Sequence, residues 1–215
     1  MVDIEKIEKR TVQSFYEDGL VEIAVGLIFV LLSAYFFSQT IIPKGSSINA
    51  ILTGLFIIVL VSSNFLGSRF VRFFKRRIAY PRTGYVAFKK KEQSPKRRAA
   101  AAITAGLIGA SVAALYGLSS STKALMPALF GLLLGIAVFF IAHRIGLVRF
   151  YVLSAISAVI GVAVAVAGVE EMRGIFFYYA FFGASVLFSG VVTLVLYVRR
   201  FPRLPADAPE GPDAH

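Results

Sequence analysis

Residues 67–98 read GSRFVRFFKRRIAYPRTGYVAFKKKEQSPKRR and separate two long apolar parts of the chain. Positions 69–98 hold twelve Lys or Arg residues and one acid, Glu92, which amounts to a net charge of +11. The whole chain has the same formal net charge, so the charged residues outside this segment cancel one another. A basic segment between apolar segments indicates a membrane protein and, through its charge, an orientation in the membrane.

The composition also favours an integral membrane protein over a soluble globule. Of the 215 residues, 57% are apolar and 16% are charged, and the mean hydropathy is +0.75. A spanning helix needs roughly 20 mostly apolar residues to cross a ~30 Å hydrocarbon core. Six stretches meet this requirement: 20–38, 48–66, 99–118, 124–142, 149–169 and 175–198. We therefore predict an all-α integral membrane protein, a bundle of six transmembrane helices.

The connections and charges predict how these helices run. Short connections make neighbouring helices antiparallel, so we expect three hairpins, at 20–66, 99–142 and 149–198. Basic residues are retained on the cytoplasmic side. If both termini share that side, it collects 20 of the 23 Lys and Arg residues. The chain has the general look of small prokaryotic membrane proteins, and we expect it in the cytoplasmic membrane with both termini and the basic loop 67–98 in the cytoplasm.

The two ends of the chain lie outside the predicted spans. In residues 1–19, apolar and charged residues recur at helical spacing, which predicts an amphipathic helix on the cytoplasmic surface. This helix lies either in the headgroup plane or against the base of the bundle. Residues 199–215 are rich in proline and carry acids, which is typical of a disordered cytoplasmic tail.

Small residues recur at helix-packing spacing within the spans. They allow helix backbones to approach closely in lipid, where the hydrophobic effect does not drive association. These contacts form either within one chain or between copies in a homo-oligomer. The candidate packing residues are Ala105, Gly109, Ala113, Gly117, Gly131 and Gly135.

The basic loop contains two candidate binding regions. In 67–77 bases alternate with aromatic residues, which predicts a basic amphipathic helix that contacts anionic headgroups. In 79–88 a turn at Pro81 and Gly84 could hold a phosphate or a carboxylate, since arginine binds such groups bidentately. The alternative is that the bases only satisfy the positive-inside rule. The candidate lipid- or partner-binding residues are Arg69, Arg72, Lys75, Arg76, Arg77, Tyr80, Arg82 and Tyr85.

One ionisable residue, Glu22, lies inside the end of a predicted span, where burial of a charge is costly. His143 and Arg144 follow a later span and reach the same interface. Together the three residues are a candidate polar site that could do acid–base chemistry on a phosphorylated substrate. The alternative is that they are helix-end charges near the headgroups and the helix dipole.

Several kinds of site lack their usual residues. The chain has no cysteine, and His143 and His215 are its two histidines, so a zinc or haem site lacks its ligands. Nucleotide-binding, metalloprotease and hydrolase motifs are absent from the sequence. We therefore predict no metal and no cofactor. We also predict no nucleic-acid partner, because no recognised nucleic-acid-binding pattern surrounds the bases.

These features predict a non-enzymatic scaffold or accessory subunit. Its basic loop would engage anionic lipid or an acidic protein on the cytoplasmic side. The alternative is a small transporter or channel for an uncharged or lipid-like solute, with glycine and serine of the later spans lining a cavity. A membrane enzyme that uses Glu22, His143 and Arg144 is a third hypothesis.

Overall fold

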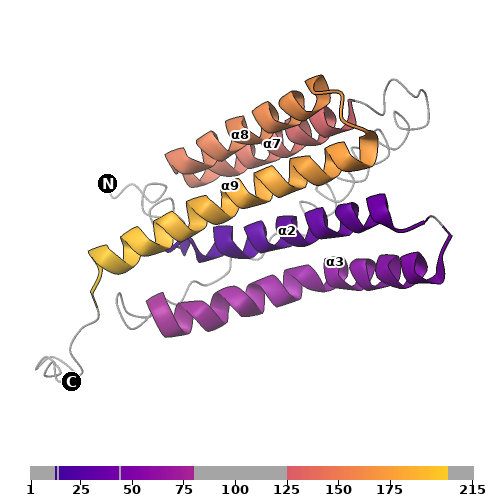
Figure 1. Cartoon of the computed structure of the whole chain (residues 1–215). Coiled ribbons are helices and arrows are strands. Elements are labelled where there is room, and N and C mark those ends of the chain that lie inside the picture. Colours follow the sequence, from indigo (N-terminus) through magenta and orange to yellow (C-terminus); the bar gives the residue numbers. More distant parts are fainter. Residues whose placement is uncertain (1–12, 14, 44, 80–124, 203–215) are drawn as a thin grey trace, which may run out of the picture.

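The computed structural model describes residues 13, 15–43, 45–79 and 125–202, and the regular structure in these ranges is entirely helical. A π-helical turn, η1 (Lys75–Ala79), continues the second long helix. The long helices lie side by side along a common direction (Figure 1). They are α2 (Leu20–Ile41), α3 (Ser47–Phe74), α7 (Met126–Ile145), α8 (Val148–Val166) and α9 (Glu171–Arg200).

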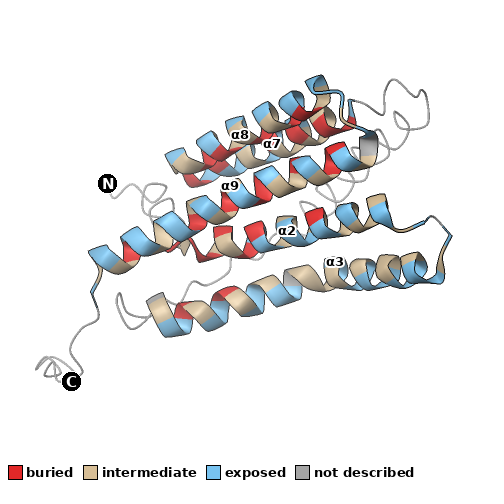
Figure 2. Ribbon diagram, viewed as in Figure 1, coloured by how far each residue is buried: buried red, intermediate tan, exposed pale blue. Residues whose placement is uncertain are grey.

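Among the described residues, four helices, α2, α7, α8 and α9, are long and apolar enough to cross a membrane. α3 is a fifth candidate if its two halves, Ser47–Ser63 and Phe65–Ile78, count as one bent span. The outer faces of the helices carry exposed apolar side chains, such as Val61 (78% exposed) and Phe188 (72% exposed). Figure 2 shows that the buried residues are confined to the helix contacts. For the described residues, the prediction of an all-α fold with several helices apolar enough to span a membrane is confirmed.

The described helices begin and end close to the predicted spans, with one exception. α3 ends at Phe74 and η1 at Ala79, well past the predicted end of the second span at position 66. The added length covers the whole of the predicted basic amphipathic helix, 67–77, which was expected to continue the second span. The predicted third span, 99–118, lies outside the described residues, as do most of the predicted N-terminal helix and C-terminal tail.

One end of the bundle, which we call the basic end, holds the start of α2, the end of α3, the α7–α8 connection and the end of α9 (Figure 1). At the opposite end, Arg173 is the one Lys or Arg residue among those that the structure describes. The charge asymmetry predicted from the sequence is thus present in the described part of the bundle. The described bases at the basic end are Arg69, Arg72, Lys75, Arg76, Arg77, Arg144, Arg149, Arg199 and Arg200.

The most extensive helix contacts join α2 to α9 and α7 to α8. The predicted hairpins would instead make α2 with α3, and α8 with α9, the main pairs. Those pairs do touch, but less extensively. The hairpins are therefore not confirmed as the packing units. Chain order sets the direction of neighbouring helices, whereas close packing depends on where the side chains are small.

Glycines bring α2 and α9 into close contact. A Cβ atom on Gly26 would lie 2.6 Å from Leu187, and one on Gly190 would lie 2.8 Å from Ile23. Both distances are shorter than real Cβ contacts, so a larger residue at either position would push the helices apart. Neither glycine was among the predicted packing residues, because a single glycine in an apolar run gives no repeating pattern.

Small residues also bring α7 and α8 together. A Cβ atom on Gly131 would lie 2.7 Å from the Cα atom of Gly161. The Ser157 hydroxyl donates to the Gly131 carbonyl at 2.9 Å, and the Ser154 hydroxyl donates to the Gly135 carbonyl at 2.8 Å. Gly131 and Gly135 therefore lie at a contact within the chain. The other predicted packing residues, Ala105, Gly109, Ala113 and Gly117, lie outside the described residues.

α3 changes direction by 54° between Ser63 and Phe65. The hydroxyl of Ser63 donates to the carbonyl of Leu60 at 2.7 Å, and the hydroxyl of Ser68 donates to that of Phe65 at 2.9 Å. Serine hydroxyls that bond to carbonyls of the preceding turn bend helices, and Gly67 weakens the helix at the same place. The basic half of α3 is therefore strongly inclined to its apolar half.

Gly131→Ala is expected to destabilise the full-length protein in detergent by about 1–3 kcal/mol, because the added methyl group would overlap the backbone of Gly161. Gly54→Ala is the matched control, since no described atom lies within 4 Å of its Cβ position and alanine favours a helix. The measurement is the temperature at which each variant loses its monodisperse size-exclusion peak. Equal midpoints for the two variants would contradict the close contact of α7 and α8.

Candidate functional site

Two acids, Asp18 and Glu22, are buried at the basic end, where the chain enters α2. Asp18 is 3% exposed and Glu22 is 2% exposed. Gly19 lies between them with a φ of +69°, and a Cβ atom there would lie 2.5 Å from the carbonyl oxygen of Gly190. The turn therefore presses the start of α2 against α9. A carboxylate buried in this way is unfavourable unless a cation or hydrogen-bond donors accompany it.

Lys75 of η1 supplies the cation for Asp18. Its Nζ atom lies 3.0 Å from Asp18 Oδ2, and both side chains are almost fully buried. The same ammonium donates to the carbonyl of Phe15 and lies 3.5 Å from the centre of the Phe15 ring. Asp18 also accepts the backbone N–H of Leu20 at 3.2 Å. Lys75 thus connects the end of α3 to the residues that precede α2.

Arg149 in the first turn of α8 supplies the cation for Glu22. Its Nε atom lies 2.8 Å from Glu22 Oε1, and the two groups form an ion pair. These two atoms do not form a hydrogen bond with each other, so the attraction between them is electrostatic. The second carboxylate oxygen of Glu22 accepts the hydroxyl of Ser189, on α9, at 2.8 Å. Arg149 also donates to the carbonyl of Tyr16. Glu22 therefore joins α2 to both α8 and α9.

The described residues before α2 pack against the base of the bundle. In addition to the two carbonyls bound by Lys75 and Arg149, the Gln13 amide donates to the carbonyl of Gly146 at 3.4 Å. The Tyr16 ring meets Phe150 edge to face, with centroids 5.9 Å apart. The sequence left two positions open for the predicted N-terminal helix, in the headgroup plane or against the base of the bundle. The described residues of this segment lie against the base of the bundle.

These contacts form a buried charge network of Asp18, Lys75, Glu22, Arg149 and Ser189. The two acids balance the two bases, so the network is neutral without a bound ion. Each carboxylate faces a base of the protein and accepts one further hydrogen bond, from the Leu20 N–H or the Ser189 hydroxyl, so it is engaged within the bundle and not directed at a substrate. No group of three metal-binding side chains occurs among the described residues. The geometry therefore suits a structural connection between helices better than proton transfer.

The predicted polar site of Glu22, His143 and Arg144 is not brought together. Glu22 is engaged by Arg149 and Ser189, whereas His143 and Arg144 are exposed in the last turn of α7. All three residues lie at the basic end, as their positions at span ends predicted. The base that approaches Glu22 comes from the start of the next helix, because Arg149 reaches into the bundle and the two α7 residues point outward.

The predicted binding residues of the basic loop fall into different environments. Lys75 is buried in the charge network, and it cannot bind a ligand without leaving Asp18 uncompensated. Tyr80, Arg82 and Tyr85 lie outside the described residues. The remaining predicted residues, Arg69, Arg72, Arg76 and Arg77, are exposed.

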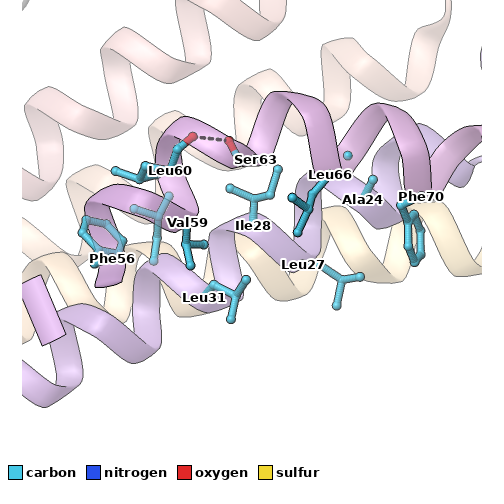
Figure 3. Close-up of a pocket in the computed structure, with 12 residues that line it drawn as sticks. Ala24, Leu27, Ile28, Leu31, Phe56, Val59, Leu60, Ser63, Leu66 and Phe70 are labelled. Carbon is cyan, nitrogen blue, oxygen red and sulfur yellow. Dashed lines mark hydrogen bonds between the residues drawn. The ribbon is translucent and has the colours of Figure 1, made fainter. Parts of the chain in front are cut away.

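An apolar groove of about 330 Å³ lies between α2 and α3 (Figure 3). Towards the opposite end, the two helices meet through the Tyr35 and Phe56 rings, which stack 3.7 Å apart. At the basic end they are joined by the Lys75–Asp18 pair. The groove is lined by aliphatic and phenylalanine side chains, and Ser63 is its polar lining residue. Such walls suit a hydrocarbon chain and offer a polar solute almost nothing to bond.

The sequence analysis missed Asp18, Arg149 and Ser189 as parts of a site. Asp18 and Glu22 do stand four residues apart at the entry to a span, which signals that two cations are needed nearby. The same end of the bundle offers many bases at similar depth, so the choice of Lys75 and Arg149 depends on the tertiary structure. Comparisons with protein-family models, curated proteins and solved structures found no match to this chain.

Lys75→Met is expected to destabilise the full-length protein by about 3–5 kcal/mol, because it leaves the Asp18 carboxylate buried without its cation. The double variant Asp18→Asn/Lys75→Met removes both charges and should recover a large part of that loss. The stability of each variant is measured by thermal or denaturant unfolding in one detergent.

Glu170→Gln is the control for this comparison. Glu170 and Arg173 form an exposed pair 3.7 Å apart at the opposite end of the bundle. Loss of an exposed pair should change the stability by no more than about 1 kcal/mol. A Lys75→Met variant as stable as this control would show that the buried charge network does not hold the bundle together.

Proposed function

We propose that this chain is a non-enzymatic membrane scaffold or accessory subunit whose basic end presents an anion-binding surface to the cytoplasm. The proposal rests on one observation at that end: the acids are buried and paired with bases, whereas most of the bases are exposed. The buried acids are neutralised by Lys75 and Arg149, and the other described bases there are exposed. Those bases give the surface an excess of positive charge, which favours anionic groups on a partner or a membrane.

The way in which the two buried acids are held supports a non-enzymatic role for the charge network. A general acid or base must reach a substrate within hydrogen-bonding distance. Asp18 and Glu22 are both buried, and each is already bonded to groups of the protein within about 3 Å. Removing either from its partner would cost several kcal/mol. The network therefore supports a rigid base from which exposed arginines project.

We further propose that the bundle has six spans and that both termini are cytoplasmic. η1 finishes at the basic end, and α7 starts at the opposite end (Figure 1). The chain between Ala79 and Leu125 must therefore pass from one end of the bundle to the other. Within that segment, 99–118 is the stretch with the length and apolar composition of a spanning helix.

The transporter hypothesis is favoured by one observation, the apolar groove between α2 and α3 (Figure 3). Its walls suit a lipid-like solute and exclude an ionic one. This hypothesis requires net movement of an apolar solute through the protein in reconstituted vesicles, whereas a scaffold does not. We rank it second because Ser63 is the one polar side chain among the described residues that line the groove, which is too little to orient or select a solute.

Single cysteines at Arg77 and Leu125 test the topology, and the cysteine-free wild type gives no background. Both positions are exposed and they flank the segment 80–124. On intact cells, a membrane-impermeant thiol reagent should label Leu125→Cys and spare Arg77→Cys, which it should label after the membrane is opened. Arg144→Cys, on the basic end of α7, is expected to behave like Arg77→Cys. Labelling of both flanking positions in intact cells would contradict six spans.

The anion-binding role is tested with full-length protein extracted together with its surrounding lipid in polymer-bounded discs. Anionic phospholipids should be enriched in the discs relative to the bulk membrane. The enrichment should fall as salt is raised during extraction, because exposed charges are screened. Discs with the lipid composition of the bulk membrane at every salt concentration would contradict the lipid form of this proposal.

A further inference from the structure

The face of α3 that points away from α2 changes from apolar to basic along its length. In its first half, the exposed residues on this face include Ile58 (63% exposed), Val61 (78%) and Phe65 (57%). Steps of three or four residues keep to one helix face. Continuing in such steps from Phe65 leads to Arg69, Arg72 and Arg76, which are exposed as well. One continuous helix face is therefore apolar for several turns and then cationic.

The length of α3 places this change near the membrane boundary. Residues 47–66 form a helix of about 30 Å, which matches the thickness of the hydrocarbon core. The helical chain goes on to Ala79, so Arg69 and the bases after it fall at the level of the headgroups. The 54° bend brings their segment closer to the membrane plane than to its normal if the first half stands upright.

The three arginines are available for a ligand. The Arg69 guanidinium lies 4.6 Å from the centre of the Phe65 ring, which orients it and leaves its N–H groups free to donate. The Arg72 Nε atom donates to the Ser68 carbonyl at 3.1 Å, and its terminal nitrogens extend beyond that bond. Among the described acids, none forms an ion pair with Arg69, Arg72 or Arg76. Phe70 and Phe73 complete a shallow groove around them.

We infer that Arg69, Arg72 and Arg76 bind the phosphate groups of anionic phospholipids, whose acyl chains lie along the Ile58–Phe65 part of the same face. A phospholipid has this same succession of hydrocarbon and anion. An acidic protein would account for the arginines alone, since it could not cover an apolar face at membrane depth. The inference deepens the proposed function and rests on it, because it needs the basic end to lie at an anionic leaflet.

The inference also assigns different roles to basic residues that look equivalent in the sequence. Lys75 lies between Arg72 and Arg76 in the chain, but its ammonium is committed to Asp18. Its side chain lies on the buried edge of this face, as does that of Val71 (8% exposed) one turn before it. Binding therefore involves Arg69, Arg72 and Arg76, which share this helix face, and leaves Lys75 out.

The test compares lipid retention by full-length variants in detergent, measured by native mass spectrometry with phosphatidylglycerol and phosphatidylcholine. The wild type should retain phosphatidylglycerol in preference to phosphatidylcholine. Arg69→Gln/Arg72→Gln/Arg76→Gln should weaken that binding on the order of 100-fold, since each base near an anionic headgroup contributes about fivefold. The corresponding triple Lys variant should recover most of the affinity. It also provides a folded comparison if the Gln variant proves unstable.

Arg144→Gln/Arg199→Gln/Arg200→Gln is the matched control, because it removes the same charge from exposed positions at the same end. It should keep phosphatidylglycerol binding within a few-fold of wild type. An equal loss in both triple variants, or no loss in either, would overturn the assignment to α3 while the wild-type preference, and the proposed function, stand. A wild type with no preference for phosphatidylglycerol would remove both.

Competition identifies the source of the anion. Inorganic phosphate at millimolar concentration should not displace the lipid, because it makes no contact with the apolar half of the face. Displacement by inorganic phosphate would overturn the inference in favour of a free-phosphate site. Displacement by an oligoglutamate peptide at the concentration of the lipid would overturn it in favour of an acidic protein partner.

Discussion

The carboxylates of Asp18 and Glu22 are buried where the chain begins α2, and each needs a cation from another part of the chain. Desolvation makes a buried Asp18 or Glu22 unfavourable alone, and the penalty falls only when a base lies within a few ångströms. Lys75 and Arg149 satisfy that need from the ends of two distant segments. The constraint positions the end of α3 and the start of α8 relative to α2. It also holds the residues before α2, whose carbonyls accept further hydrogen bonds from the same two bases.

Much of the remaining helix packing depends on glycine. Between helices in lipid, attraction comes from close packing and hydrogen bonds, so backbones must approach where side chains are absent. Gly26 and Gly190 provide such places between α2 and α9, and Gly131 and Gly161 do so between α7 and α8. Within the described part of the chain, α3 has no comparable contact, since the positions of Gly54 and Gly67 are open. It is joined to α2 near its two ends, which leaves the apolar groove between them.

This arrangement separates a rigid base from an exposed cationic face. The bases that complete the buried network lose their freedom to bind anything else, and those that remain outward retain it. Lys75 and Arg76 are neighbours in the chain, yet one is 5% exposed and the other points to the outside. A surface with a fixed helix beneath it presents its arginines in a defined spacing, which favours binding because less side-chain and backbone freedom is lost.

The sequence by itself determined the class of protein, the ends of most described helices and the gathering of bases at one end. These follow from hydropathy over some twenty residues and from charge counts, which are local properties. It predicted Gly131 and Gly135 as small positions for helix packing, but it did not identify Gly26 or Gly190. The tertiary structure alone decided which helices pair, that Glu22 meets Arg149 while His143 and Arg144 stay outside, and that Lys75 is buried. Each of these depends on how a helix is rotated and on which distant residue faces it, and many rotations satisfy the same hydropathy.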